Sequence, residues 1–252
     1  MQLNDAAVLV TGAGSGLGAA TAEALAAAGA RVVAMDLNAE GLAALAARCD
    51  ATPIAGDVAS EADVATALEA AAGLGPLRLA VNCAGIAPGA RVVSRGGAHD
   101  LALFERAIRV NLVGTFNVLR LAAQRMQALD PTAPDGERGV IVNTASIAAE
   151  DGQIGQCAYA ASKAGVMGLT LPAARELAKT GIRVMTIAPG LFETPMLAGL
   201  PEAAQAAIRA LPPFPARLGR PEEFARMVLA ICANPLLNGT TLRLDSALRL
   251  PA

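Results

Sequence analysis

Three side chains in the second half of this 252-residue chain have the types and the spacing for proton transfer. Tyr159 is the single tyrosine of the chain, and Lys163 follows it by four residues. In a helix predicted over about residues 158–179, positions four apart share one face, so the phenol and the ammonium point the same way. A free phenol has a pKa of about 10, and a nearby cation favours its deprotonated form. The pair is therefore suited to general acid–base catalysis.

The third side chain is Ser146, thirteen residues before the tyrosine, at the end of a predicted strand. Its hydroxyl can hydrogen-bond a substrate oxygen and hold it for proton transfer. A tyrosine and a lysine at this spacing also occur as a solvated pair on an exposed helix, and for the pair alone that interpretation is favoured. Features typical of a dinucleotide site elsewhere in the chain reverse this preference.

A glycine-rich segment, TGAGSGLG at residues 11–18, follows the first predicted strand and opens a predicted helix. Gly12, Gly16 and Gly18 would allow a tight turn, a close approach of backbone N–H groups to a pyrophosphate, and packing of the helix on the sheet. The helix N-terminus favours the anion. A tight turn without any ligand has the same glycines, so the loop by itself is a weak indication.

Asp36 strengthens the nucleotide interpretation, because it ends the second predicted strand 18 residues after Gly18. A carboxylate there accepts hydrogen bonds from the adenosine ribose hydroxyls of NAD. It repels the 2′-phosphate of NADP, and Ala13, Ser15 and Leu37 offer no positive charge to receive that group. We therefore predict NAD as the cofactor. A helix N-cap is the alternative role for Asp36, but it does not explain the glycines upstream.

Two further segments fall at the same predicted edge of the sheet. Asp57-Val58 follows the third strand and is placed to lie along an adenine. Asn82-Cys83-Ala84-Gly85 ends the fourth strand, on the carboxyl edge where open α/β sheets bind ligands. A simple strand-end turn is the alternative for this second segment.

Apolar runs typical of strands alternate with helical stretches through most of the chain, which indicates βαβ units and a parallel sheet buried on both faces. We predict an α/β fold, a doubly wound Rossmann sheet of about seven strands in a single domain covering residues 1–252. Surface loops are expected at 94–100 and 130–138, and a substrate lid at 191–215 with a helical patch at 201–211. The clearest strand runs are 6–10, 31–35, 78–82, 139–145 and 182–187.

Composition excludes several classes of protein. With 20 Lys and Arg against 22 Asp and Glu, no Trp, one Tyr and five Phe, the chain lacks the basic surplus and the aromatic platforms of nucleic-acid-binding proteins. The longest charge-free stretch, 6–22, is cut by glycines and predicts no membrane span. The spacing of Cys49, Cys83, Cys157 and Cys232 fits neither a disulfide framework nor a zinc site, so we predict reduced thiols, no metal and a cytoplasmic location.

Seven motifs occur in one order along the chain: TGAGSGLG, Asp57-Val58, NCAG, Asn111, Ser146, Tyr159-x-x-x-Lys163 and Pro189-Gly190. In that order they resemble the short-chain dehydrogenase/reductase family over nearly the whole chain. An ordered set of this kind is far more specific than any single motif. The stretches VNLVGTFNV, RGVIVNTASIAA, TLPAAREL, GIRVMTIAPGLF, PFPARLG and NPLLNG resemble its type II 3-hydroxyacyl-CoA dehydrogenase branch.

The resemblance implies a catalytic tetrad of Asn111, Ser146, Tyr159 and Lys163. Tyr159 would exchange the substrate hydroxyl proton while a hydride passes between the adjacent carbon and the nicotinamide. Lys163 would lower the pKa of Tyr159 and hold the nicotinamide ribose, and Asn111 would position a water molecule. Gln153 would lie beside the substrate oxygen, and the assembly would be a homotetramer. Further cofactor contacts are implied at Ser15, Leu17, Asp36, Asp57, Val58, Cys83, Pro189, Phe192 and Thr194.

The chain departs from the branch at two positions, where Glu193 and Ser246 replace glycine. An acid at position 193 would disfavour a phosphate-rich CoA tail if it faced the substrate. The single histidine, His99, is interpreted as a surface or capping residue outside the mechanism.

The sequence thus predicts an NAD-dependent dehydrogenase of short or branched 3-hydroxyacyl-CoA. A hydroxysteroid or other secondary alcohol dehydrogenase would share every catalytic residue and differ only in the lid. A reductase of carrier-linked 3-oxoacyl groups is opposed by Asp36. A non-catalytic NAD-binding partner protein is opposed by the intact tetrad.

Overall fold

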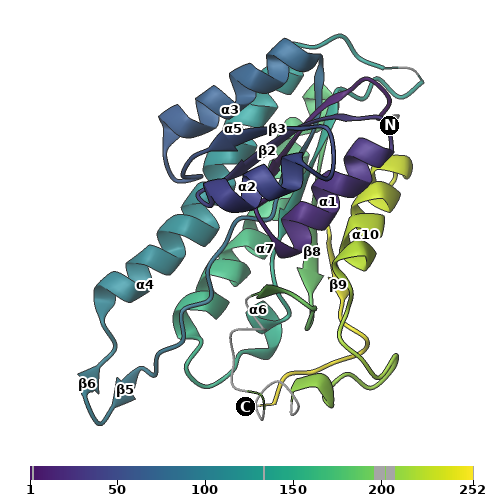
Figure 1. The fold of residues 1–252 in the computed structure, drawn as a ribbon. Helices are drawn as coiled ribbons and strands as arrows, with labels where there is room; N and C mark the ends of the chain where they lie inside the picture. The colour runs from purple at the N-terminus through teal and green to yellow at the C-terminus, as the bar shows by residue number, and fades with distance from the viewer. Residues whose placement is uncertain (2, 133, 196–201, 203–207, 252) are drawn as a thin grey trace.

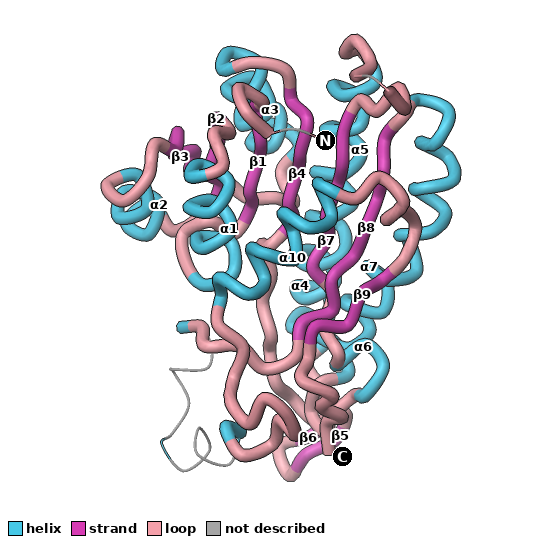
Figure 2. Tube along the Cα trace, turned by 90° about the vertical axis from the view of Figure 1, so that its right-hand side faces the viewer, coloured by secondary structure: helices cyan, strands magenta, loops and turns pink. Residues whose placement is uncertain are grey.

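The computed structural model describes residues 1, 3–132, 134–195, 202 and 208–251. Parallel strands form one sheet in the order β3-β2-β1-β4-β7-β8-β9 (Figure 2). The order runs outward from β1 in both directions, which is the doubly wound topology predicted from the sequence. The strands are β1 (Ala7–Thr11), β2 (Arg31–Asp36), β3 (Ala51–Ala55), β4 (Leu77–Asn82), β7 (Gly139–Thr144), β8 (Ile182–Pro189) and β9 (Thr241–Leu244).

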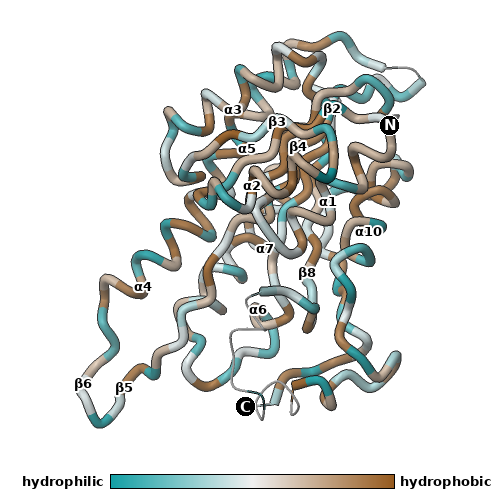
Figure 3. Tube along the Cα trace, viewed as in Figure 1, coloured by the Kyte–Doolittle hydropathy of each residue, from teal (hydrophilic) through white to brown (hydrophobic). Residues whose placement is uncertain are grey.

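Helices cover both faces of this sheet (Figure 1). In β1, Val8 and Val10 pack toward one helical layer, whereas Ala7 and Leu9 pack toward the other. Because both faces are buried, the strands are apolar throughout rather than alternating, and Figure 3 shows this apolar centre. The first layer contains α1 (Gly16–Ala27), α2 (Ala39–Ala46) and α10 (Pro221–Ala233), and the second contains α3 (Glu61–Leu74), α5 (Gly114–Gln127) and α7 (Cys157–Leu177).

Shorter elements surround the carboxyl edge of the sheet or connect the helices. The antiparallel pair of β5 (Val93–Ser94) and β6 (Gly97–Ala98), with α4 (Leu101–Ile108), projects from the body as an arm (Figure 1). The loop expected at 94–100 is thus partly a small hairpin. The others are the π-helical turn η1 (Arg109–Val113), the single-turn α6 (Ala148–Asp151) and the 3₁₀ turn η2 (Ala178–Thr180).

The two outer strands had the weakest sequence patterns. In β3, only Ala51 is buried and Pro53 interrupts the apolar run, and β9 has four half-buried residues. The loop expected at 130–138 has, among its described residues, an isolated bridge between Thr132 and Glu137. The predicted helical patch at 201–211 lies mostly outside the described residues. Within the described part of the chain, no helix is long and apolar enough to cross a membrane.

Candidate active site

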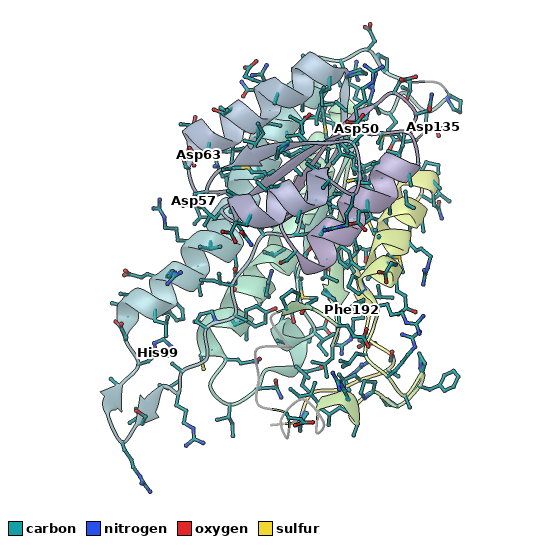
Figure 4. The ribbon with its side chains drawn as sticks, viewed as in Figure 1. Asp50, Asp57, Asp63, His99, Asp135 and Phe192 are labelled. Carbon is teal, nitrogen blue, oxygen red and sulfur yellow. The ribbon has the colours of Figure 1, made fainter. Side chains whose placement is uncertain are left out.

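The carboxyl ends of the central strands surround a cavity of about 370 Å³. Its wall includes Ser146 with Tyr159 and Lys163 of α7. Phe192, labelled in Figure 4, joins this wall from the segment after β8. Asn82 is the one predicted cofactor residue that does not line it. The predicted cofactor residues that line it are Gly12, Ser15, Gly16, Leu17, Gly18, Asp36, Asp57, Val58, Cys83, Ala84, Gly85, Tyr159, Lys163, Pro189, Phe192 and Thr194.

The glycine-rich loop is packed too closely for side chains. Gly12 has a φ of +65°, and a Cβ on it would lie 2.5 Å from the backbone nitrogen of Ala84. A Cβ on Gly18 would lie 2.1 Å from the carbonyl oxygen of Gly12. The loop, the start of α1 and the end of β4 therefore meet backbone against backbone, and the open side of this turn forms part of the cavity wall.

Asp36 joins the glycine-rich loop to the end of β2. Its Oδ2 accepts a hydrogen bond of 2.9 Å from the Gly14 backbone N–H, and its Oδ1 accepts one of 2.8 Å from Asn38. The N-cap of α2 is Asn38, whose side chain accepts from Gly41 at 3.1 Å. The N-cap role considered for Asp36 thus belongs to Asn38, and the Asp36 carboxylate is held at the cavity wall.

The segment after β3 is fixed in a similar way. The backbone N–H of Asp57 donates to the carboxylate of Asp63 at 2.8 Å. Asp57 precedes α3, Asp63 lies in its first turn, and the two are neighbours in Figure 4. The carbonyl oxygen of Val58 accepts a hydrogen bond of 2.9 Å from Asn117 of α5. These contacts place the Val58 side chain on the cavity wall.

Asn111 lies in the π-helical turn η1 and is completely buried. Its Oδ1 accepts from the Ile86 backbone N–H at 2.8 Å, and its Nδ2 donates to the Ile86 carbonyl at 2.8 Å and to Ser162 Oγ at 2.9 Å. The amide is thus fully engaged within the protein and clamps the segment after β4 to α7. The water site implied at Asn111 stays a prediction. A π turn is a frequent feature of functional sites.

Lys163 is buried, Tyr159 is half-buried, and both line the cavity. The Lys163 Nζ lies 5.9 Å from the centre of the Tyr159 ring and donates to the Thr144 carbonyl oxygen at 2.8 Å. Burial lowers the pKa of Lys163 to about 8. Burial also raises the pKa of Tyr159, and the hydroxyl of Ser146 opposes this increase. The implied lowering of the Tyr159 pKa by Lys163 stays a prediction.

The thiol of Cys83 lies next to this group. It accepts a hydrogen bond from Thr144 Oγ1 at 3.7 Å, and burial raises its pKa to about 11. It is therefore a neutral thiol at physiological pH. All four cysteines of the chain are free, as their spacing predicted.

Asn82 and Gln153 lie away from the cavity. Asn82 pairs in register with Asn143 of β7, and its Nδ2 donates to the Asn143 Oδ1 at 2.9 Å inside the sheet. Gln153 follows α6, and its Nε2 donates to the Pro251 carbonyl at 3.5 Å. Asn82 thus supports the sheet behind the site, and the expected place of Gln153 beside a substrate stays a prediction.

The first residues of the predicted lid contact the segment that directly follows the lid. Phe192 forms a parallel bridge with Gly219, and a Cβ on that glycine would lie 2.7 Å from the phenyl ring. Glu193 is exposed and does not line the cavity. Residues 196–201 and 203–207 of the predicted lid are outside the described structure.

His99 is on the projecting arm (Figure 4), where its Nδ1 lies 2.7 Å from the Asp100 carbonyl. It is half-buried there, with its ring edge-on to that of Phe104, and the expected surface or capping role stays a prediction.

Three residues of the site carried no clear sequence signal. Thr144 and Ile86 contribute backbone groups, which any residue type would provide. Ser162 holds Asn111 through its hydroxyl, and its place directly before the lysine is the one feature that marks it.

The family model described as short chain dehydrogenase matches residues 6–205. The chain belongs to this family. A short-chain dehydrogenase of Drosophila melanogaster named 3-hydroxyacyl-CoA dehydrogenase type-2 is 52% identical over 255 residues, covering 98% of this chain and 99% of the relative. The human protein of that name is 51% identical over 249 residues, covering 96% and 94%. The crystal structure of 3-hydroxyacyl-CoA dehydrogenase type-2 from Mycobacterium avium is similar, with a TM-score of 0.94, 46% identity and coverage of 99% and 98%.

Proposed function

We propose that this short-chain dehydrogenase interconverts a short or branched 3-hydroxyacyl-CoA and the corresponding 3-oxoacyl-CoA, with NAD as the hydride carrier. The observation that carries the proposal is the cavity itself, which has Asp36 and the glycine-rich loop at one end and Ser146, Tyr159 and Lys163 at the other. The full-length similarity to relatives named for this reaction supports the acyl-CoA class.

The cavity fits a dinucleotide. Gly12 and Gly18 let the turn pack backbone against backbone on β4 and α1, and the open side of this turn would take the pyrophosphate. The Asp36 carboxylate would accept hydrogen bonds from the ribose hydroxyls of the adenosine, and its charge would oppose the 2′-phosphate of NADP. Asp57 and Val58 would line the adenine, and Thr194 would face the carboxamide. The NCAG segment and Pro189 with Phe192 would border the nicotinamide half.

Bound NAD⁺ supplies the hydride acceptor and a positive charge near the phenol. During oxidation, Ser146 donates a hydrogen bond to the substrate oxygen and fixes its distance from Tyr159. The Tyr159 phenolate takes the hydroxyl proton as the C–H electron pair leaves the same carbon as hydride, and the C=O bond forms. The reverse reaction returns the proton from the phenol to the oxygen. Lys163, held by Thr144, would bind the nicotinamide ribose and favour the phenolate.

The exposed position of Glu193 removes one objection to an acyl-CoA substrate. Glu193 is not among the residues that line the cavity, so its carboxylate would not repel a phosphate group bound inside it.

The decisive experiment records NADH formation by the purified protein with NAD and 3-hydroxy-2-methylbutyryl-CoA. Parallel reactions use NADP, a hydroxysteroid, and a Tyr159→Phe variant. We expect turnover that requires NAD and is lost in the variant. Turnover of the steroid alone would reject the acyl-CoA class and leave the chemistry intact. No turnover of any secondary alcohol despite NAD binding would reject the enzymatic proposal.

We also propose that the chain forms a homotetramer and acts in the cytoplasm. The outer faces of α5 and α7 carry exposed apolar side chains, of which Phe116 is 52% and Leu171 is 44% exposed. These faces border a groove lined by Phe116, Leu119 and Leu177 together with polar side chains, which a second copy would cover. Light scattering with size-exclusion chromatography tests this assembly, and a Phe116→Glu variant should dissociate it.

A further inference from the structure

Arg243, near the end of β9, is the centre of a cluster of carboxylates. Its guanidinium donates to Asp151 at 2.7 Å and to Asp245 at 2.8 Å, and it also binds Glu150. The side chains of Arg243, Asp151 and Asp245 are only 17%, 12% and 9% exposed. Ion pairs between side chains with so little exposure differ from surface pairs. Removal of one partner leaves the other charge with neither water nor a counter-charge around it.

The cluster acts on the chain segment that joins two proposed catalytic residues. Asp151 ends α6, and α6 begins two residues after Ser146. The Ser146 Oγ accepts a hydrogen bond of 3.1 Å from the backbone of Ala148, so the serine and the helical turn form one unit. The segment 147–158 then continues to Tyr159. Arg243 therefore grips the middle of a segment whose two ends carry the hydroxyl and the phenol.

Contacts on both sides of this segment make Arg243 its main outer anchor. Arg243 also donates to the Leu248 carbonyl at 3.0 Å, and Asp151 accepts from the Leu250 backbone at 3.4 Å. The C-terminal residues 245–251 are thereby fastened to the segment. On the opposite side, the Ala90 backbone donates to the Gly155 carbonyl at 2.8 Å.

The charges of the cluster show what loss of the arginine would do. Glu150, Asp151 and Asp245 bring three negative charges, and Arg249 pairs with Asp245 at 3.1 Å and acts on Asp151 only from a longer distance. Arg243 holds the pKa of Asp151 below its usual range, mainly through its hydrogen bond. Without Arg243, Glu150 and Asp151 would repel Asp245, and the segment would move away from the C-terminal residues.

We propose that Arg243 is a positioning residue for the dehydrogenase reaction: it holds the segment 147–158 so that Ser146 and Tyr159 face the same substrate oxygen. The inference rests on the proposed function for its reaction, but its structural content can be measured without any substrate. Arg243 touches neither the cavity nor the proposed reacting atoms.

The chain offers a matched control in Arg183. This arginine is also buried, pairs with Glu137 at 2.6 Å and donates to the carbonyls of Ile231 and Leu237 at 2.9 and 2.8 Å. It lies at the start of β8, at the opposite end of the sheet from the cavity. Loss of either arginine should lower the melting temperature, but only Arg243 is connected to the segment that carries the catalytic groups.

The test compares Arg243→Met, Arg243→Lys, Asp151→Asn and Arg183→Met. We expect Arg243→Met to lower kcat/KM for the secondary alcohol by about 10- to 100-fold, the size expected for a displacement near 1 Å. The Kd for NAD should stay within about twofold of wild type, and Arg243→Lys should recover part of the activity. Arg183→Met should lower the melting temperature and leave kcat/KM of the folded protein unchanged.

A substrate-free readout separates this inference from the proposed function. Tyr159 is the single tyrosine and there is no tryptophan, so ultraviolet absorbance titrates this phenol alone. Arg243→Met should shift that titration and Arg183→Met should not, whether or not an acyl-CoA is the substrate. If Arg243→Met does not fold, Asp151→Asn, which removes one charge and keeps the side-chain shape, should give the same shift. An unchanged Tyr159 titration with unchanged kcat/KM in the folded variant overturns the inference.

Discussion

The Nζ of Lys163 donates a 2.8 Å hydrogen bond to the carbonyl oxygen of Thr144, the last residue of β7. This bond ties the catalytic face of α7 to the strand that leads directly to Ser146. It also leaves the ammonium buried at 4% exposure, with a neutral carbonyl as its hydrogen-bond partner. Burial of the charged Lys163 ammonium is costly in free energy, and this hydrogen bond offsets only part of the cost.

Lys163 should therefore make stability depend on pH. The pKa of Lys163 falls from 10.5 to about 8 on folding, so between these pH values the unfolded chain binds more protons than the folded protein. Stability of the wild type relative to a Lys163→Met variant should increase by about 3 kcal/mol from pH 8 to 10.5, and the full penalty should remain below pH 8. Urea unfolding across this range measures the difference.

The matched control is Lys179→Met, which removes the other lysine of the chain from an exposed site. Its stability difference from wild type serves as the baseline for removing an exposed lysine. A Lys163→Met difference that does not change with pH beyond this baseline would show that burial does not penalise the charged ammonium.

Asn111 should contribute to both stability and turnover. Substitution with Ala removes three hydrogen bonds and leaves both backbone groups of Ile86 without their partner, so the free energy of unfolding should fall by about 2 kcal/mol or more. Because the clamp between Ile86 and α7 is lost, kcat should fall as well.

Asn117→Ala, which removes a buried hydrogen bond to Val58, should instead raise the KM for NAD. Equal kinetic effects of the two variants would contradict the separate roles.

Asp36 should determine the choice of cofactor. A double variant, Asp36→Ala with Leu37→Arg, removes the charge that opposes a 2′-phosphate and supplies one that attracts it. The kcat/KM for NAD should fall about 10-fold or more, as expected for loss of a charged hydrogen bond, and that for NADP should rise. Steady-state kinetics with both cofactors checks this. An unchanged preference would place the adenosine ribose away from β2.

Ser246 should be a site where glycine stabilises the protein. Its φ is +55°, a left-handed conformation that costs residues with a Cβ about 1–2 kcal/mol. Ser246→Gly removes this strain, and the greater entropy of glycine in the unfolded chain offsets only part of the gain. The free energy of unfolding should therefore increase by about 0.5–1 kcal/mol. Ala43→Gly, in the exposed part of α2, should lower it by about 1 kcal/mol. Chemical denaturation measures the free energy of unfolding of the two variants. Changes of the same sign in both variants would refute the conformational argument.

The sequence predicted those parts of the fold that depend on local patterns. The apolar runs identified the inner strands because burial on both faces favours apolar side chains at most positions. Gly12 and Asp36 indicated the proposed nucleotide end because each residue type is needed there. The outer strands β3 and β9 are half-buried, so their patterns were weak.

The parts that could not be predicted depend on long-range contacts. The partners of Asn111 and Lys163 are mostly backbone groups, which carry no residue signature. Arg243 meets Asp151 from 92 positions away, and no local pattern links two such residues. The burial that sets the pKa of Tyr159 likewise comes from the packed fold and not from the four-residue spacing to Lys163.

The most direct test of the proposed chemistry is an absorbance titration of the single tyrosine with and without NAD⁺. Without cofactor, burial should keep the pKa of Tyr159 above its ordinary value of 10.0. With saturating NAD⁺, the added positive charge should lower it by at least about 2 units in the wild type, and by much less in Lys163→Met. A Tyr159 pKa that NAD⁺ does not move would contradict the role of this phenol as the proton acceptor.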